Sequence, residues 1–242
     1  MPHFYVDPKN IKNNTFIIDE EQFHYLVNVR RFSSGDEIKI FDGLGNSFLA
    51  RIDCVSKKRI SGTIVSAKTF RIPKIKVSLY TAIPKGDRFE WLIEKSSEIG
   101  VSKIVPTIYS RSVVSDISKN KFERYQKISL SASSQCSRAD IMKIEEPLDF
   151  MSVLNSFTGQ KKMLNILPWE CEEKQTIRQI FENVHDVEKV NIFIGPEGGF
   201  DKEEIKRAFE NNFNTITLGE NILRVETAAI VAASVTLSFA GI

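Results

Sequence analysis

Short apolar runs alternate with turn residues between Glu37 and about Ala67. This pattern is typical of a β meander, and the Gly43 and Gly45 region predicts a tight connection between two of its strands. Ahead of the meander, Phe23, Leu26, Val27 and Arg30 are spaced as on one face of a short amphipathic helix. We therefore expect residues 1–70 to form a small β-rich domain.

The pattern changes near Arg71, where β-branched runs begin to alternate with helical segments. Strands are predicted at 75–83, 103–109, 162–167, 189–194 and 214–218, and helices at 86–99, 119–134, 173–183 and 201–211. Such alternation predicts an α/β domain over residues 71–242, with a mostly parallel sheet covered by helices. The first of these helices should end at Gly100, because glycine is the usual residue after a helix.

The last segment, Val225 to Ala240, is apolar or small on almost every side. A helix with this composition should be buried, either in the core of the chain or between two copies of it. Self-association is therefore an expectation.

Composition and charge exclude several classes of protein. The 42% hydrophobic content suits a soluble globular chain, and a net charge of +2 neither requires nor excludes a polyanionic partner. Three cysteines without paired spacing and three histidines make a metal site or a histidine-based hydrolase improbable. Without a leader pattern or an apolar run of membrane-spanning length, we expect a cytoplasmic protein that contacts no membrane and needs no metal.

The segment NIFIGPEGGFDKEEI contains a predicted strand, a turn with three glycines, and a helix opened by Asp201 and Glu204 in capping-box spacing. It lacks the sequence of a phosphate-binding loop, and Pro196 and Glu197 both weaken an anion site. A glycine loop that carries a carboxylate suits a neutral or cationic ligand, such as the sulfonium of S-adenosylmethionine. The alternative is a plain strand-to-helix turn.

A second glycine loop, TLGENILRVETAA, follows the next predicted strand. Charged residues beside an apolar helix are costly unless they are paired or used, so Arg224 and Glu226 form either a structural pair or part of a site. Ligands of open α/β sheets bind at the carboxyl ends of strands, and two glycine loops there favour a pocket.

These two segments resemble the signature of the RsmE family of 16S ribosomal RNA uridine-N3 methyltransferases, which belong to the SPOUT superfamily. The resemblance extends to HYLVNVRRFSSGDEIKIFDGLGN, PKGDRFEWLIEKSSEIGVSKIVP and SSQCSRADIMKIEEP, in the same order. It implies a PUA-like β-barrel followed by an α/β domain with a C-terminal trefoil knot, S-adenosyl-L-methionine as cofactor, the small ribosomal subunit as partner, and a homodimer.

The resemblance also implies roles for individual residues, carried over by position. The donor site would include Leu167, Pro168, Ile194, Gly195, Pro196, Glu197, Gly198, Gly199, Leu218, Gly219, Ile222, Leu223, Arg224 and Thr227. RNA contacts would come from Arg30, Arg31, Lys85, Gly86, Arg88, Gln135 and Arg138, whose alternative is a solvated basic surface. The sequence departs from the family at His3, Ser134, Cys136-Ser137 and Glu220-Asn221, which bears on the RNA contacts.

Methylation at N3 of uracil requires loss of a weakly acidic proton, with the reactants held in position. An arginine near the carbonyls would stabilise the developing charge, and Arg224 or Arg138 is the candidate. Glu226, hydroxide or water would take the proton. Two other functions remain open: a noncatalytic RNA-binding assembly factor, and a SPOUT enzyme acting on another RNA such as transfer RNA.

Overall fold

The computed structural model describes residues 3–70, 73–157, 160, 162–184 and 186–241. It divides into two compact units. The small unit contains Met1–Ile72 together with Leu130–Ile141, and the large unit contains Pro73–Ser129 and Met142–Ile242. The small unit thus includes a segment from the middle of the chain. The domain boundary between residues 70 and 71 stays a prediction.

The small unit is built on a six-stranded sheet in the order β1-β4-β5-β6-β3-β2. Its strands are β1 (His3–Tyr5), β2 (Ile11–Lys12), β3 (Thr15–Ile18), β4 (Glu37–Phe41), β5 (Asn46–Val55) and β6 (Ile60–Thr69). The predicted meander is confirmed, since β4, β5 and β6 pair antiparallel in succession. Three short strands before residue 19 were not predicted, because two to four residues are too few to show a period.

Two helical segments of the small unit lie between β3 and β4: α1 (Glu20–His24) continues as the π-helical segment η2 (Tyr25–Val29). A short turn, η1 (Pro8–Asn10), lies earlier in the chain, between β1 and β2. The predicted helix is therefore confirmed, and Leu26 from its apolar face is fully buried among residues of the sheet. Arg31 follows with a left-handed backbone, φ 57°.

The segment 136–141 pairs with the turn between β4 and β5. The Gly45 N–H donates to the carbonyl of Ala139 at 3.0 Å, and Gly43 and Leu44 form isolated bridges with Asp140. Gly43 has φ +74°, and an added Cβ would lie 2.8 Å from Ile141 Cδ1. Glycine at this turn therefore allows the close approach that binds 136–141 to the sheet.

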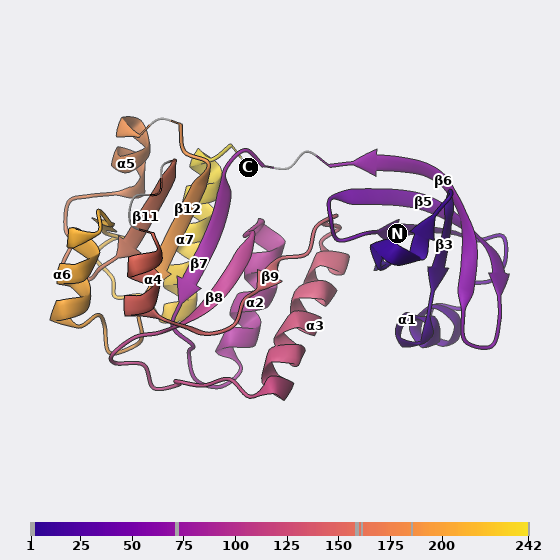
Figure 1. Cartoon of the computed structure of the whole chain (residues 1–242), viewed down its shortest axis with the longest axis horizontal. Coiled ribbons are helices and arrows are strands. Elements are labelled where there is room, and N and C mark those ends of the chain that lie inside the picture. Colours follow the sequence, from indigo (N-terminus) through magenta and orange to yellow (C-terminus); the bar gives the residue numbers. More distant parts are fainter. Residues whose placement is uncertain (1–2, 71–72, 158–159, 161, 185, 242) are drawn as a thin grey trace. The chain divides into compact units, whose positions relative to one another are not determined.

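The large unit contains a seven-stranded sheet in which every pairing is parallel, in the order β10-β8-β7-β12-β11-β13, with β9 beside β8 (Figure 1). Its strands are β7 (Lys76–Thr81), β8 (Lys103–Ile108), β9 (Lys143–Ile144), β10 (Leu148–Asp149), β11 (Met163–Pro168), β12 (Lys189–Ile194) and β13 (Asn214–Ile216). All five predicted strands are confirmed. The two that were missed have only two residues each.

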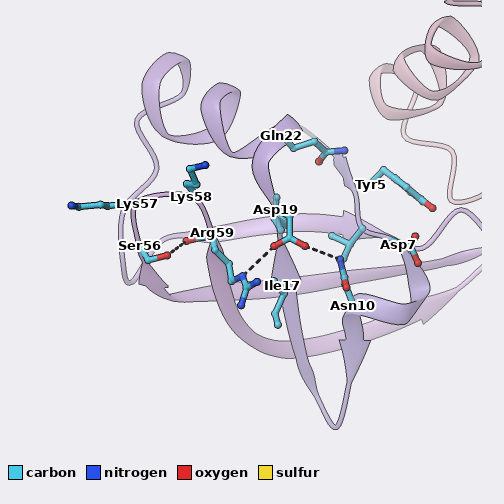
Figure 2. A pocket seen from close by; sticks show the side chains of 12 residues that line it. Tyr5, Asp7, Asn10, Ile17, Asp19, Gln22, Ser56, Lys57, Lys58 and Arg59 are labelled. Atoms are coloured by element: carbon cyan, nitrogen blue, oxygen red, sulfur yellow. Dashed lines mark hydrogen bonds and ion pairs between the residues drawn. The ribbon is translucent and has the colours of Figure 1, made fainter. Parts of the chain in front are cut away.

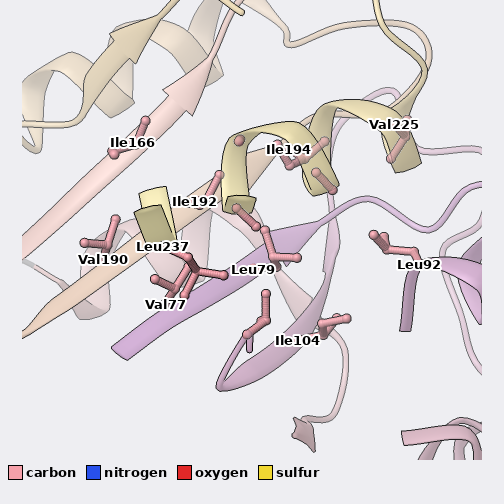
Figure 3. Packing of buried hydrophobic residues seen from close by; sticks show 14 of the residues in the cluster. Val77, Leu79, Leu92, Ile104, Ile166, Val190, Ile192, Ile194, Val225 and Leu237 are labelled. Carbon is pink, nitrogen blue, oxygen red and sulfur yellow. The ribbon is translucent and has the colours of Figure 1, made fainter. Parts of the chain in front are cut away.

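Helices cover both faces of this sheet. They are α2 (Arg88–Ile99), α3 (Lys119–Gln135), α4 (Phe150–Ser156), α5 (Ile177–Asn183), α6 (Lys202–Glu210) and α7 (Val225–Phe239). The residues of α3 from Leu130 onward belong to the small unit. Alternate residues of β7 point to opposite faces: Val77 and Leu79 pack with α2, α5 and α7, whereas Tyr80 packs with α4 and α6. Figure 3 shows the first of these clusters, with side chains from the strands meeting α7 and α2. The expected α/β architecture with a parallel sheet is confirmed; the trefoil knot stays a prediction.

The end of α2 and the burial of α7 were both predicted from the sequence. Gly100 ends α2 with φ 103°, as predicted. The expectation that α7 is buried holds for one side, where Ala229, Ala232 and Leu237 join the core. Its other side leaves Val235 and Phe239 exposed by 37% and 42% in the single chain. None of the helices in the described ranges is long and apolar enough to cross a membrane.

Candidate functional site

The carboxyl ends of three neighbouring strands define one edge of the large sheet. β11 lies between β12 and β13, with Ile166 opposite Ile192 and Pro168 opposite Ile216. Because all three strands are parallel, the segments that follow them leave the sheet at the same edge. The structure therefore brings together Leu167 and Pro168, residues 194–199, and Leu218 with Gly219.

Residues 195–201, here called the glycine loop, connect β12 to α6. Gly199 has φ +69°, and its N–H donates to the Pro196 carbonyl at 2.9 Å. At Gly195 an added Cβ would lie 2.9 Å from the ring of Phe200, which is buried beside Tyr109 and Phe150. The left-handed backbone therefore favours glycine at position 199, and the close contact with Phe200 favours glycine at position 195.

The glycine loop ends in a complete capping box, as the sequence predicted. Asp201 accepts from the Glu203 N–H, and Glu204 Oε2 accepts from the Asp201 N–H at 2.7 Å. Glu204 is only 2% exposed, and its other oxygen accepts from the Ser110 N–H at 2.7 Å. The buried carboxylate thus joins α6 to the turn that follows β8.

Sequence reasoning missed Arg111, which also contacts the glycine loop. Its Nη1 donates to the Gly198 carbonyl at 3.0 Å, and its Nη2 lies 3.3 Å from Asp201 Oδ2. Since 87 positions separate Arg111 from Gly198, no local spacing could have indicated this contact. Only the pairing of β8 with β7, and of β7 with β12, brings the two segments together.

The second loop, residues 217–224, runs from β13 to α7. The Thr217 N–H donates to the Gln175 carbonyl at 2.8 Å, and the Gly219 N–H donates to Thr217 Oγ1 at 3.1 Å. Gly219 has φ +111°, a conformation that favours glycine. Glu172 supports the start of this loop by accepting from Thr215 Oγ1. The backbone N–H groups of Lys174 and Gln175 also donate to Glu172 and lower its pKa.

Arg224 and Glu226 stand at the first turn of α7 and are not paired with each other in the described part of the chain. Arg224 is exposed, whereas Glu226 is 9% exposed and its Oε2 has no hydrogen-bond partner among the described residues. The alternative of a structural Arg224–Glu226 pair is therefore wrong. Ile222, nearby in the same loop, is 90% exposed, and Leu223 and Thr227 are half-buried and exposed respectively.

The candidates for RNA contact are divided between the two units. Lys85, Gly86 and Arg88 follow β7 in the large unit, where the Ala82 N–H donates to the Ile194 carbonyl at 2.9 Å. Exposed residues Arg30, Arg31 and Gln135 belong to the small unit. Lys85, Gly86 and Arg88 therefore lie at the same edge of the large sheet as the glycine loop.

Arg138 also belongs to the small unit and is held by local contacts. Its Nε and Nη2 donate to the two carboxylate oxygens of Asp140 at 3.1 and 2.8 Å, and its side chain is 14% exposed. His3 is buried as well, with Nε2 2.9 Å from Ser47 Oγ, and burial lowers its pKa. Both side chains thus contribute to the packing of the small unit.

A separate hollow of about 970 Å³ lies within the small unit (Figure 2). Asp19 is at its centre, pairing with Arg59 at 3.1 Å and accepting from Asn10 Nδ2 at 3.4 Å. Acidic and basic groups are mixed around it, with Asp7 and Lys57 also in the lining. Such a surface lacks the single sign of charge that favours phosphate binding.

Comparison with known proteins gives two family matches that together span most of the chain. Residues 18–65 match the RNA methyltransferase PUA domain, and residues 71–237 match the RNA methyltransferase domain. The chain is 32% identical over 228 residues to ribosomal RNA small subunit methyltransferase E of Bacillus subtilis, covering 91% of this chain and 88% of that protein. The Mesomycoplasma hyopneumoniae protein of the same name is 34% identical over 233 residues, covering 95% and 96%.

Solved structures agree with these matches. The ribosomal RNA small subunit methyltransferase E of Neisseria gonorrhoeae, bound to S-adenosyl methionine, superimposes with a TM-score of 0.85 at 28% identity, covering 98% of both chains. A putative methyltransferase of Legionella pneumophila, in complex with the cofactor SAM, gives a TM-score of 0.84 at 29% identity and covers 98% of this chain and 97% of that one. The chain therefore belongs to the RNA methyltransferase family that contains ribosomal RNA small subunit methyltransferase E.

Proposed function

We propose that the protein transfers a methyl group from S-adenosyl-L-methionine to ribosomal RNA of the small subunit. The observation that carries the proposal is the convergence of two glycine loops at the carboxyl edge of β11, β12 and β13. The names of the curated relatives and the cofactor in the Neisseria and Legionella structures support the same activity.

The groups at this edge fit a methyl donor. Gly195 and Gly199 let the loop backbone pass close to the Phe200 ring and the Glu170 side chain, which fixes its path, and the Glu197 carboxylate suits a cationic centre better than a phosphate. Backbone groups of the loop after β13 can recognise a nucleobase. The donor-binding assignments are Leu167, Pro168, Ile194–Gly199, Leu218, Gly219, Ile222, Leu223, Arg224 and Thr227.

For the reaction we propose N3 of one uridine in 16S ribosomal RNA as the acceptor. The donor, when bound, supplies an electrophilic methyl group on its sulfonium. Arg224 is exposed and would donate to the uracil carbonyls, stabilising charge as the N3 proton leaves. Glu226, at the same helix start, has a buried oxygen with no hydrogen-bond partner in the part of the chain that the structure describes, and would accept that proton, directly or through water.

The target base must leave its stack to reach such an edge, which requires RNA contacts around it. We assign these contacts to Arg30, Arg31, Gln135 and Arg138 of the small unit and to Lys85 and Arg88 of the large unit. We also propose that the protein is a homodimer that acts in the cytoplasm; the exposed apolar side of α7, with Val235 and Phe239, supports the self-association.

Calorimetry and methyl transfer together test this function. We expect the protein to bind S-adenosylmethionine and to transfer labelled methyl to small ribosomal subunits from a strain that lacks the gene. Naked 16S ribosomal RNA and transfer RNA serve as alternative acceptors. Absence of donor binding would indicate a noncatalytic RNA-binding factor, and preferential labelling of transfer RNA would contradict the proposed substrate.

A further inference from the structure

The turn after β8, residues 109–112, contacts the glycine loop and α6 through two consecutive residues. Arg111 reaches the Gly198 carbonyl at 3.0 Å and Asp201 Oδ2 at 3.3 Å, while the Ser110 N–H donates to Glu204 at 2.7 Å. One turn therefore holds both the middle of the glycine loop and the helix that follows it.

This turn is itself fixed to the core. The Tyr109 hydroxyl donates to the Tyr80 carbonyl at 3.0 Å, and its ring packs 4.8 Å from that of Phe150 and 5.4 Å from that of Phe200. The Ser112 side chain closes the turn by accepting from the Tyr109 N–H at 2.9 Å. Arg111 thus extends from a turn that is fixed to the core by the buried Tyr109 side chain.

The chemistry of the contact favours arginine. A planar guanidinium can donate to a carbonyl and a carboxylate at once, whereas a lysine ammonium is a single point charge. The Arg111 side chain packs directly against Gly198. A Cβ added to Gly198 would lie 3.2 Å from Arg111 Cβ and 3.5 Å from its Cδ, so a larger residue at position 198 would crowd the arginine. The hydrogen bonds therefore favour arginine at position 111, and the close packing favours glycine at position 198.

The ion pair itself should contribute little to folding. The side chains of Arg111 and Asp201 are 49% and 40% exposed, and such pairs stabilise a protein only weakly. The main consequence of the contact is then the orientation of the Gly198 peptide, and with it the path of the glycine loop. We propose that Arg111 is a positioning residue that holds the glycine loop in the shape that binds the methyl donor; this rests on the proposed function.

The test compares Arg111→Ala and Arg111→Lys with Arg207→Ala in the full chain. Arg207 lies on α6, pairs with Glu203 and Glu210, and loses the same charge without touching the loop. Calorimetry with S-adenosylmethionine should give a Kd about tenfold higher for Arg111→Ala, a smaller rise for Arg111→Lys, and no change for Arg207→Ala. The affinity for small-subunit ribosomal RNA and the thermal midpoint should match those of Arg207→Ala.

The possible outcomes separate this inference from the proposed function. If the wild type binds the donor and both Arg111 variants bind it equally well, the positioning role is wrong while the proposed function stands. If Arg111→Ala fails to fold, Arg111→Lys decides the question alone, and an unchanged Kd in that variant overturns the role. If the wild type does not bind the donor, both proposals fall together.

Discussion

The residues assigned to the methyl donor lie at one edge of one sheet, whereas those assigned to RNA are divided between two units. Parallel pairing of β11 with β12 and β13 brings the donor segments together without any help from the small unit. Gln135 and Arg138, in contrast, belong to a segment bound to the small unit. Donor binding should therefore depend on the large unit alone, and RNA recognition on both.

The two largest effects should be losses of methylation, one of them from removing the proposed charge-stabilising arginine at the donor edge. Arg224→Ala should lower kcat about 10²- to 10³-fold, the usual loss when a donor to developing negative charge is removed. Binding of S-adenosylmethionine should weaken much less, because the other residues assigned to the donor and the backbone of the loop remain. Steady-state methylation and calorimetry measure the two quantities, and an unchanged kcat would remove Arg224 from the mechanism.

Arg138→Ala gives the corresponding change in the small unit. We expect methylation to be lost while donor affinity is retained, because Arg138 and its pair with Asp140 stand in the segment assigned to RNA. Asp140→Asn is a matched variant that weakens the pair but keeps the arginine. Turnover equal to wild type in Arg138→Ala would contradict this role.

A smaller effect, at least tenfold on donor affinity, is expected from Gly195→Ala. The new Cβ would lie 2.9 Å from the Phe200 ring, and overpacking of this kind costs about 1–3 kcal/mol. Because the buried ring cannot withdraw, the glycine loop should move instead. Calorimetry should show weaker S-adenosylmethionine binding together with unchanged RNA affinity.

Gly62→Ala is the matched control in the other unit. A Cβ there would meet the Arg51 carbonyl and the Phe16 ring inside the small sheet. This variant should lose RNA affinity while donor affinity stays within about twofold, a difference of less than 0.5 kcal/mol. Parallel losses of both affinities in either variant would contradict the separation of the two regions.

Glu204→Gln should destabilise the large unit by about 1–3 kcal/mol, because an amide cannot accept from both backbone N–H groups through two oxygens. Glu203→Gln, exposed on the same helix, provides the control. Denaturant unfolding measures the difference between the two variants. Equal stabilities would show that the buried carboxylate does not hold the turn to α6.

The smallest effect concerns pH and the small unit. Burial lowers the pKa of His3 from its ordinary 6.5, so below pH 6.5 the unfolded chain binds more protons than the folded one. Stability contributed by neutral His3 is thus present above that pH and declines as the pH falls. Thermal midpoints between about pH 7.5 and 5.5 should fall by a few degrees more in wild type than in His3→Gln. Equal declines in the two proteins would contradict this role of His3. His24→Gln, which changes an exposed histidine, is the control.

Much of this architecture could be predicted from the sequence, for reasons that particular elements make clear. Long strands such as β5 and β12, and the glycine after α2, have local signals that nothing in the tertiary structure overrides. The capping box at Asp201 is equally local. Short strands β9 and β10 have too few residues to show a period, so they could not be found.

The contacts that were missed join segments far apart in the chain. Arg111 and Gly198 meet only because their strands are separated by β7 alone, and the pairing of residues 136–141 with the Gly43 turn depends on the small sheet. The alternative of an Arg224–Glu226 ion pair was wrong for another reason, since two charged residues close together at a helix start need not face each other. Sequence spacing therefore predicted the strands, helices and turns better than the partners of individual side chains.

The most direct test of the central claim is mass mapping of small-subunit ribosomal RNA from a strain that lacks the gene. We predict that one 3-methyluridine disappears, that the wild-type gene restores it, and that Gly195→Ala restores it poorly. An unchanged set of methylated uridines in the deletion strain would contradict the assignment of this chain as a small-subunit ribosomal RNA methyltransferase.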